Sequence, residues 1–230
     1  MIIHSKSETG EKALKEQEGA LIGLSIRNSY FKDENLHELI SWAKDNFKYV
    51  NIMCPDHPAI HTLESLGYDK KKAQEKANLA CNNLENKCRR IVDKLGIADR
   101  TRFVRWDDLE KNEKYNAMYR AMKVLYEKDD TFRNDARDAT KQVIEHHGTE
   151  LPMEDAIDIG IEFFLKELAF ILNAADILGI PKSAYLYHKE MPVLEKLLDG
   201  KYNFTPPQNN GYIICETNYS ISKGAHQKTG

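Results

Sequence analysis

Two short apolar runs decide the fold of this chain: ALIGLSI (20–26) and YVNIMC (49–54). Aliphatic runs of this length are typical of buried strands. The residues between them carry apolar side chains at helical spacing, namely Leu36, Leu39, Ile40, Ala43 and Phe47. A strand, a helix and a second strand in this order form a βαβ unit, which predicts a parallel sheet.

The remaining sequence continues this alternation of strands and helices. Further strands are expected at TRFVRW (101–106), AYLYH (184–188) and YIICE (212–216). Further helices are expected at residues 70–95, 113–128, 131–146, 153–178 and 192–199. These elements predict one Rossmann-like α/β domain over residues 19–217, with a parallel sheet flanked by helices. The polar segments 1–18 and 218–230 are expected to be flexible.

Length and composition fit one globular unit. Of the 230 residues, 41% are hydrophobic and 30% are charged, which is ordinary for a soluble domain. No apolar run approaches the roughly 20 residues that cross a membrane. The N-terminus lacks the apolar core of a signal peptide, so we expect a cytoplasmic protein. The formal net charge of -3 argues against a broadly basic nucleic-acid binder but leaves room for a local basic patch.

The four cysteines are Cys54, Cys81, Cys88 and Cys215, and they form no C-x-x-C pair. This spacing predicts neither a disulfide framework nor a zinc site. We therefore expect reduced thiols in the core.

Ser25 stands at the end of the first predicted strand, where polar residues interrupt the apolar run. A serine there can be a nucleophile, a helix cap or a phosphate ligand. The G-x-S-x-G nucleophile elbow is absent, because Arg27 occupies the place of its second glycine. No G-x-G-x-x-G or P-loop pattern indicates a nucleotide. Ser25, Cys54 and His188 all follow predicted strands, and ligands of open α/β sheets bind at such strand ends.

Glu167 lies inside the most apolar predicted helix. At helical spacing, its carboxylate shares a face with Phe163, Phe164, Phe170 and Ile171. An unpaired charge there would be costly or would have a raised pKa. Two interpretations remain open: a buried ion pair with an arginine or lysine of another element, or a site for a cationic group of the substrate, such as an α-ammonium.

A basic stripe runs along the long helix predicted at residues 70–95. Its members are Lys76, Lys87, Arg90 and Lys94, which lie within about 60° of one another around the helix axis. Most stripes of this kind are solvated faces. The alternative is a surface that binds phosphates without sequence preference.

Three parts of the sequence together resemble the cyclodipeptide synthases, which make cyclic dipeptides from two aminoacyl-tRNAs. They are the motif Gly23-x-Ser25-x-x-Asn28-Ser29-Tyr30-Phe31, Glu167 in its apolar helix, and the pair Tyr187-His188 at a later strand end. Asn28, Tyr187 and His188 indicate the branch of the family that carries Asn, Tyr and His at these positions. The resemblance covers about residues 20–216 and implies a fold similar to the catalytic domains of class I tyrosyl- and tryptophanyl-tRNA synthetases. The H-I-G-H and K-M-S-K-S signatures of those synthetases are absent, so the amino acid should arrive already activated as a tRNA ester.

The resemblance also implies a mechanism. Ser25 would carry aminoacyl and dipeptidyl esters in a ping-pong reaction that uses no cofactor and no metal. Glu167 would hold the ammonium of the first amino acid, and Tyr187 would take part in proton transfer during cyclisation. Asn28 and His188 would position the catalytic groups.

Binding residues follow from the same resemblance. Gly23 would let the substrate approach the backbone, and Leu21, Phe163, Phe170 and Tyr185 would line the pocket of the first amino acid. The family usually has a tyrosine at the position of Phe163, where it shares the ammonium, so this chain lacks that hydroxyl. Lys76, Lys87, Arg90 and Lys94 would bind the first tRNA. The expected partners are two aminoacyl-tRNAs, without a membrane or DNA partner, and the protein is expected to be a monomer.

Two other functions compete with this prediction. A serine hydrolase would use Ser25, an acid such as Asp155 or Asp158, and His188, in the chain order serine, acid, histidine. A non-catalytic tRNA- or nucleotide-binding module would explain the basic stripe but not the carboxylate in the apolar helix.

Overall fold

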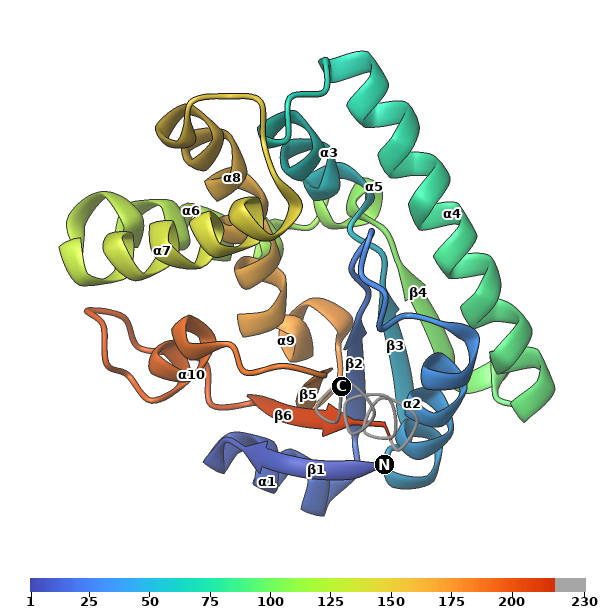
Figure 1. The fold of residues 1–230 in the computed structure, drawn as a ribbon. Helices are drawn as coiled ribbons and strands as arrows, with labels where there is room; N and C mark the ends of the chain where they lie inside the picture. Colours follow the sequence, from blue (N-terminus) through green and yellow to red (C-terminus); the bar gives the residue numbers. More distant parts are fainter. Residues whose placement is uncertain (218–230) are drawn as a thin grey trace, which may run out of the picture.

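The structure is a computed structural model that describes residues 1–217. Its centre is a six-stranded sheet in the order β1-β6-β5-β2-β3-β4 (Figure 1). The strands are β1 (Ile2–Lys6), β2 (Gly19–Gly23), β3 (Tyr49–Met53), β4 (Thr101–Val104), β5 (Ser183–Tyr187) and β6 (Asn210–Glu216). Strands β2 to β6 pair in parallel, and β1 runs antiparallel to β6. The predicted parallel α/β sheet is confirmed, whereas the tail predicted at 218–230 lies outside the described residues.

Helices cover both faces of the sheet (Figure 1). They are α1 (Glu8–Glu16), α2 (Asp33–Asn46), α3 (Asp56–Ser65), α4 (Lys70–Leu95), α5 (Trp106–Leu109), α6 (Glu113–Lys128), α7 (Asp130–His147), α8 (Met153–Leu172), α9 (Ala174–Leu178) and α10 (Pro192–Leu198). Helices α2 and α4 pack on one face of the sheet, and α8 to α10 pack on the other, with α6 and α7 outside α8. None of the helices within residues 1–217 is long and apolar enough to cross a membrane.

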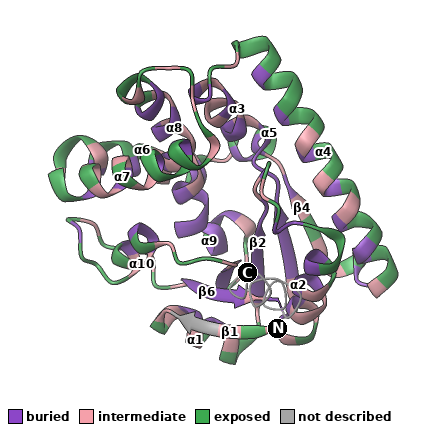
Figure 2. Cartoon of the chain, in the orientation of Figure 1, coloured by how far each residue is buried: buried purple, intermediate pink, exposed green. Residues whose placement is uncertain are grey.

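Strand residues alternate between these two layers, because successive side chains of a strand point to opposite faces. In β2, Ala20 and Ile22 belong to the core under α2 and α4, while Leu21 belongs to the core under α8. Both faces of the central strands are buried (Figure 2). The four cysteines are free and buried, as predicted.

The N-terminal segment differs from the prediction, because residues 2–16 form β1 and α1 rather than a flexible arm. The link between them is tied to β6: the backbone N–H of Tyr212 donates to Ser7 Oγ at 2.9 Å. Ser7 also caps α1 by accepting from the N–H of Gly10. A Cβ on Gly211 would come within 2.2 Å of the Gly10 nitrogen, so the two backbones pack as closely as glycine allows. These contacts join residues about 200 positions apart and leave no local signature.

Two helices also differ from the sequence pattern. The helix predicted at 153–178 is broken at Asn173 into α8 and α9. Helix α3 was not predicted, because Pro55 and Pro58 stand at its start. Proline is compatible with the first turn of a helix, although a pair of prolines more often marks a loop.

The strand order puts a topological switch point between β2 and β5. From β2 the sheet continues to β3 and β4 on one side, and to β5 and β6 on the other. In parallel sheets of this kind, ligands bind at the carboxyl ends of the two strands where the order reverses. The residues that follow β2 and β5 are therefore the first place to look for a site.

Candidate active site

Ser25 and His188 lie at this switch point. Strands β2 and β5 pair in register from Gly19 opposite Ser183 to Ile22 opposite Leu186. The two chains therefore leave the sheet side by side, and the positional prediction from the sequence is confirmed for these two residues.

Asn28 connects the loop after β2 to the end of β5. The backbone N–H of Tyr30 donates to Asn28 Oδ1 at 2.9 Å, which fixes the orientation of the amide. Asn28 Nδ2 then faces His188 Nε2 at 3.0 Å. An amide nitrogen can only donate, so Nε2 accepts and the proton of the neutral ring lies on Nδ1. Burial, with a smaller effect of the Lys189 charge, lowers the pKa of His188 to about 3.

Aromatic rings hold His188 on its other sides. The Tyr30 ring stacks on the imidazole with centroids 4.0 Å apart and planes 7° from parallel. Phe31 meets the imidazole edge-on at 5.8 Å. The loop after β2 therefore fixes the end of β5 through one hydrogen bond and two ring contacts.

Tyr187 brings a hydroxyl to Ser25. The side chains of Ser25 and Asn28 are close enough to the Tyr187 hydroxyl to stabilise its charged form, which partly offsets the rise of its pKa. Burial and the nearby Glu167 carboxylate raise the pKa of Tyr187 to about 12, so at neutral pH its hydroxyl is a hydrogen-bond donor. Ser25, Asn28, Tyr187 and His188 all keep some accessible surface, so the group is not sealed within the core.

Glu167 of α8 faces this group without a cationic partner. None of the ion pairs formed within residues 1–217 involves Glu167, and burial alone raises its pKa to about 7. Its charge in turn raises the pKa values of Tyr185 and Tyr187, so the carboxyl lies near both phenols. The interpretation of Glu167 as half of a buried ion pair is wrong for the described residues, and it retains accessible surface at which a ligand can bind.

The space beside Gly23 is occupied by Tyr185. A Cβ on Gly23 would lie 2.3 Å from the Tyr185 hydroxyl oxygen and 2.6 Å from a ring carbon. Glycine is thus needed here so that the Tyr185 ring can pack, and the expected role of Gly23 in letting the substrate approach the backbone stays a prediction. Tyr185 stacks between Tyr187 and Tyr212, at centroid distances of 5.8 Å and 5.9 Å.

The residues expected to line the first pocket differ in accessibility. Leu21 and Phe170 are fully buried core residues, and Tyr185 is only 2% exposed. Phe170 packs edge-on against Trp106 at 6.2 Å. Phe163 is half-buried, one helical turn before Glu167. Of these four residues, only Phe163 has appreciable accessible surface.

The serine-hydrolase alternative does not fit this geometry. Asp158 forms an ion pair with Arg137, and Asp155 is exposed in the first turn of α8. The Nε2 of His188 is already engaged by Asn28. Among the described residues, therefore, no carboxylate forms a hydrogen bond with His188, as a triad would require.

A comparison with protein families decides the identity: the family model for cyclodipeptide synthase matches residues 2–217. This chain belongs to the cyclodipeptide synthase family. It is an aminoacyl-tRNA-dependent enzyme that forms cyclic dipeptides.

Relatives and solved structures agree with this assignment. The chain is 25% identical to the cyclo(L-leucyl-L-leucyl) synthase of Bacillus subtilis, over 94% of this chain and 89% of the relative. A crystal structure of a cyclodipeptide synthase from Bacillus thermoamylovorans is 27% identical, with a TM-score of 0.83 over 90% of this chain and 92% of that one. A tyrosyl-tRNA synthetase from Archaeoglobus fulgidus is 14% identical with a TM-score of 0.53, over 90% of this chain and 58% of that one. The last comparison confirms the predicted likeness in fold to class I synthetases.

The basic residues of this cyclodipeptide synthase lie along α4. Lys76, Arg90 and Lys94 are exposed, and Lys76 Nζ lies 5.2 Å from the centre of the Tyr68 ring. Lys87 is half-buried and pairs with Asp33 of α2 at 3.1 Å. The stripe therefore presents a surface to solvent, although one of its four cations already has an acidic partner.

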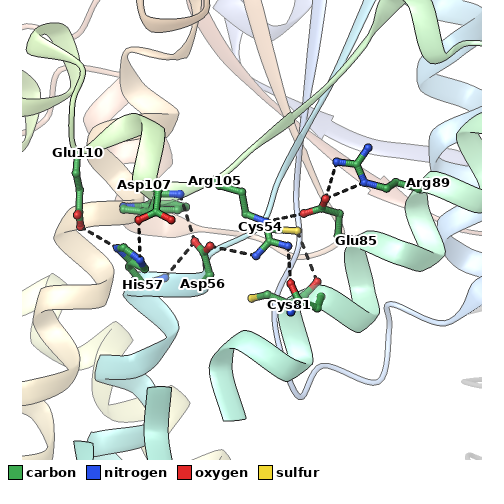
Figure 3. Close-up of polar contacts among 11 residues, drawn as sticks. Cys54, Asp56, His57, Cys81, Glu85, Arg89, Arg105, Asp107 and Glu110 are labelled. Atoms are coloured by element: carbon green, nitrogen blue, oxygen red, sulfur yellow. Dashed lines mark hydrogen bonds and ion pairs between the residues drawn. The ribbon is translucent and has the colours of Figure 1, made fainter. Parts of the chain in front are cut away.

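A second polar group, which the sequence analysis missed, joins α4 to the sheet (Figure 3). Arg105, directly after β4, contacts Glu85 of α4 at 2.6 Å and Asp56 of α3 at 3.1 Å. It also donates to the side chain of Asn82 at 2.8 Å. The side chains of Glu85 and Asp56 are 10% and 7% exposed. The predicted strand 101–106 included Arg105, and nothing near it in the sequence indicated its partners, which lie 20 and 49 positions away.

Proposed function

We propose that this synthase works by a ping-pong mechanism in which Ser25 carries first an aminoacyl and then a dipeptidyl ester. The observation that supports it best is that the Tyr187 hydroxyl lies near the side chains of Ser25 and Asn28 and near the unpaired Glu167 carboxyl. A nucleophile, a proton donor and a cation-binding group thus meet at the switch point of the sheet.

In the first step, Ser25 Oγ attacks the ester carbonyl of an aminoacyl-tRNA. The new bond joins the serine oxygen to the amino acid, and the bond to the terminal ribose breaks. The ribose oxygen leaves with the proton that serine loses, so free tRNA departs and an aminoacyl-enzyme remains. The tRNA ester supplies the activation, so the scheme needs neither ATP nor another cofactor.

Glu167 would bind the α-ammonium of this first amino acid. An ammonium beside a buried carboxyl favours the ionised carboxylate and lowers its pKa from about 7. This interaction supplies the cation that the described residues do not offer. Because the pKa of Glu167 in the free enzyme is near neutrality, the same carboxyl can accept a proton when the ammonium must become a nucleophilic amine.

In the second step, the amine of the Ser25-bound amino acid attacks the ester carbonyl of the second aminoacyl-tRNA. The peptide bond forms, the bond to the ribose breaks, and the second tRNA leaves with the proton that the amine loses. This direction leaves the dipeptide on Ser25, whereas attack by the amine of the second aminoacyl-tRNA would leave it on tRNA. The free amine of the dipeptide then attacks the Ser25 ester, closes the ring and releases the cyclic dipeptide. Ser25 Oγ regains a proton through the nearby Tyr187 hydroxyl, which in turn takes the proton that the attacking amine loses.

The remaining site residues have supporting roles in this proposal. Asn28 and His188 hold the loop after β2 against the end of β5. Lys76, Lys87, Arg90 and Lys94 of α4 bind the phosphates of the first tRNA, since a row of cations on one helix face suits a repeating anionic backbone. The protein would act as a monomer in the cytoplasm, where aminoacyl-tRNAs occur.

Expression in bacteria tests the proposal. We expect cyclic dipeptides in the medium of cells that express the wild-type chain, detected by mass spectrometry, and none with Ser25→Ala. Purified wild-type enzyme mixed with one aminoacyl-tRNA should gain the mass of one amino acid on the peptide that contains Ser25. Production by Ser25→Ala at the wild-type level would contradict the role of Ser25.

A further inference from the structure

Two cations flank the contact that holds the site together. Arg27 precedes Asn28, and Lys189 follows His188. Asn28 Nδ2 lies 3.0 Å from His188 Nε2, so this hydrogen bond joins the loop after β2 to the end of β5. Arg27 and Lys189 are the chain neighbours of the two bonded residues, and this places both cations beside the junction. Both residues are exposed, and Arg27 is two positions from Ser25. The two positive charges therefore lie at the edge of the site and not within it.

His147 at the end of α7 is within electrostatic range of the same two cations. Burial lowers the pKa of His147, and the charges of Arg27, His146 and Lys189 lower it further. His147 is half-buried, so at neutral pH it contributes an uncharged N–H donor next to two charged ones. Three basic side chains from the β2 loop, the β5 end and α7 thus surround one edge of the site, and we call Arg27, His147 and Lys189 the basic rim.

Ion pairs within residues 1–217 do not account for the charges of the basic rim. Within residues 1–217, neither Arg27, His147 nor Lys189 forms an ion pair, in contrast to Lys87, which pairs with Asp33. Arg27 also adopts the left-handed backbone conformation, with φ of 60°, which is uncommon for a residue other than glycine. The loop thus holds an exposed arginine in a costly conformation beside the nucleophile.

The proposed function, on which this inference rests, gives the rim a ligand. Each substrate brings its ester on the ribose of the terminal nucleotide, and a phosphodiester stands on the 5′ side of that same nucleotide. An ester carbonyl placed at Ser25 Oγ puts this phosphate one nucleoside away from the serine, and the exposed Arg27 is two positions from Ser25 in the same loop. We propose that the basic rim binds the phosphodiester between the last two nucleotides of aminoacyl-tRNA.

The basic rim and the basic stripe on α4 should serve different steps of the reaction. The first tRNA brings its ester to Ser25, and the second brings its ester to the amine of the amino acid held on Ser25, so the rim serves both half-reactions, whereas α4 binds the first tRNA. Arginine suits this contact because its guanidinium donates two parallel hydrogen bonds to phosphate. Loss of the rim therefore lowers the rate of acylation and also the rate of dipeptide formation on preformed aminoacyl-enzyme.

A double cycle of enzyme and substrate changes tests the rim. The enzymes are wild type and Arg27→Gln/Lys189→Gln, and the substrates are one aminoacyl-tRNA with its normal terminal phosphodiester and the same tRNA with an uncharged methylphosphonate at that linkage. The readout is kcat/KM for acylation of Ser25. We expect a loss of about 10- to 100-fold when either partner is changed, and little additional loss when both are changed.

Controls separate the possible outcomes. Lys12→Gln/Lys15→Gln on α1, at the opposite edge of the sheet, should leave kcat/KM at the wild-type value. The proposed role of the basic rim would be overturned by either of two results. One is that the losses in kcat/KM multiply when enzyme and substrate are both changed, and the other is that Arg27→Gln/Lys189→Gln loses no kcat/KM. Failure of the wild-type enzyme to acylate Ser25 with unmodified aminoacyl-tRNA would instead overturn the proposed function, so the two failures are distinguishable.

Discussion

Asn28 donates a hydrogen bond to His188, and this makes the histidine an acceptor fixed in place and not a free base. The amide of Asn28 is held by the N–H of Tyr30 at 2.9 Å, so its nitrogen must face the imidazole. His188 Nε2 can accept this bond only while it carries no proton. The serine and histidine at the ends of β2 and β5 resemble parts of a hydrolytic triad, but the geometry gives the histidine a positioning role.

The ionisation of His188 provides the first prediction. With a pKa of about 3, His188 should stay neutral from pH 5 to 8 and carry its proton on Nδ1, which NMR of the labelled ring would test. Asn28→Asp replaces the donor by a carboxylate of nearly the same shape, which favours the imidazolium and should raise the pKa of His188 by several pH units. A His188 that titrates near pH 6 in the wild type would contradict the assignment.

The second prediction concerns Glu167 and stability. Its pKa is about 7 in the folded protein, against 4.5 for an ordinary glutamate, so unfolded chains release this proton first as pH rises. Wild-type stability should therefore fall between pH 4.5 and 7 by up to about 3 kcal/mol from this residue. Glu167→Gln has no such charge, so its thermal midpoint should match the wild type near pH 4 and exceed it at pH 8. A difference between the two proteins that does not vary with pH would disprove the unpaired carboxyl.

Local pattern was sufficient to predict much of this fold. The βαβ unit containing Leu36 and Ile40 is encoded by spacing alone, and Ser25 and His188 were found because polar residues end apolar strands. The apolar face around Glu167 could also be predicted, because helical spacing alone determines which residues share a face of a helix. What these predictions share is that each rests on residues close in sequence.

The missed features depend on pairs of distant residues. Strand β1 is held by β6, and the place of α1 depends on the contact between Gly10 and Gly211. The role of Gly23 could not be inferred without its neighbour Tyr185, which lies on the adjacent strand. Composition and periodicity say nothing about such pairings, because only the folded backbone brings them together.

Gly23→Ala provides the third prediction. The new methyl group would lie 2.3 Å from the Tyr185 hydroxyl oxygen, so the ring must move. We expect a loss of about 1–3 kcal/mol in the free energy of unfolding, measured by urea denaturation. Tyr185→Leu in the same chain removes the clashing atoms, so the double variant should be more stable than Gly23→Ala alone. Equal instability of the single and double variants would show that Tyr185 is not the obstacle.

The fourth prediction concerns Arg105, which stands between Glu85 and Asp56. Arg105→Met leaves the largely buried Asp56 without a cation and Glu85 with Arg89 alone, which should lower the free energy of unfolding by about 2–3 kcal/mol. For a chain of this length, that corresponds to a thermal midpoint lower by about 5–10 °C.

The matched control is Lys12→Met, which breaks the exposed pair with Glu8 and should leave the free energy of unfolding nearly unchanged. Because Arg105 joins α4 to the sheet, adding Glu85→Gln and Asp56→Asn removes the stranded charges and should recover part of the stability. If Arg105→Met costs no more than Lys12→Met, the arginine does not anchor α4, and the orientation of its basic face must be set by the apolar contacts of Cys81 and Cys88.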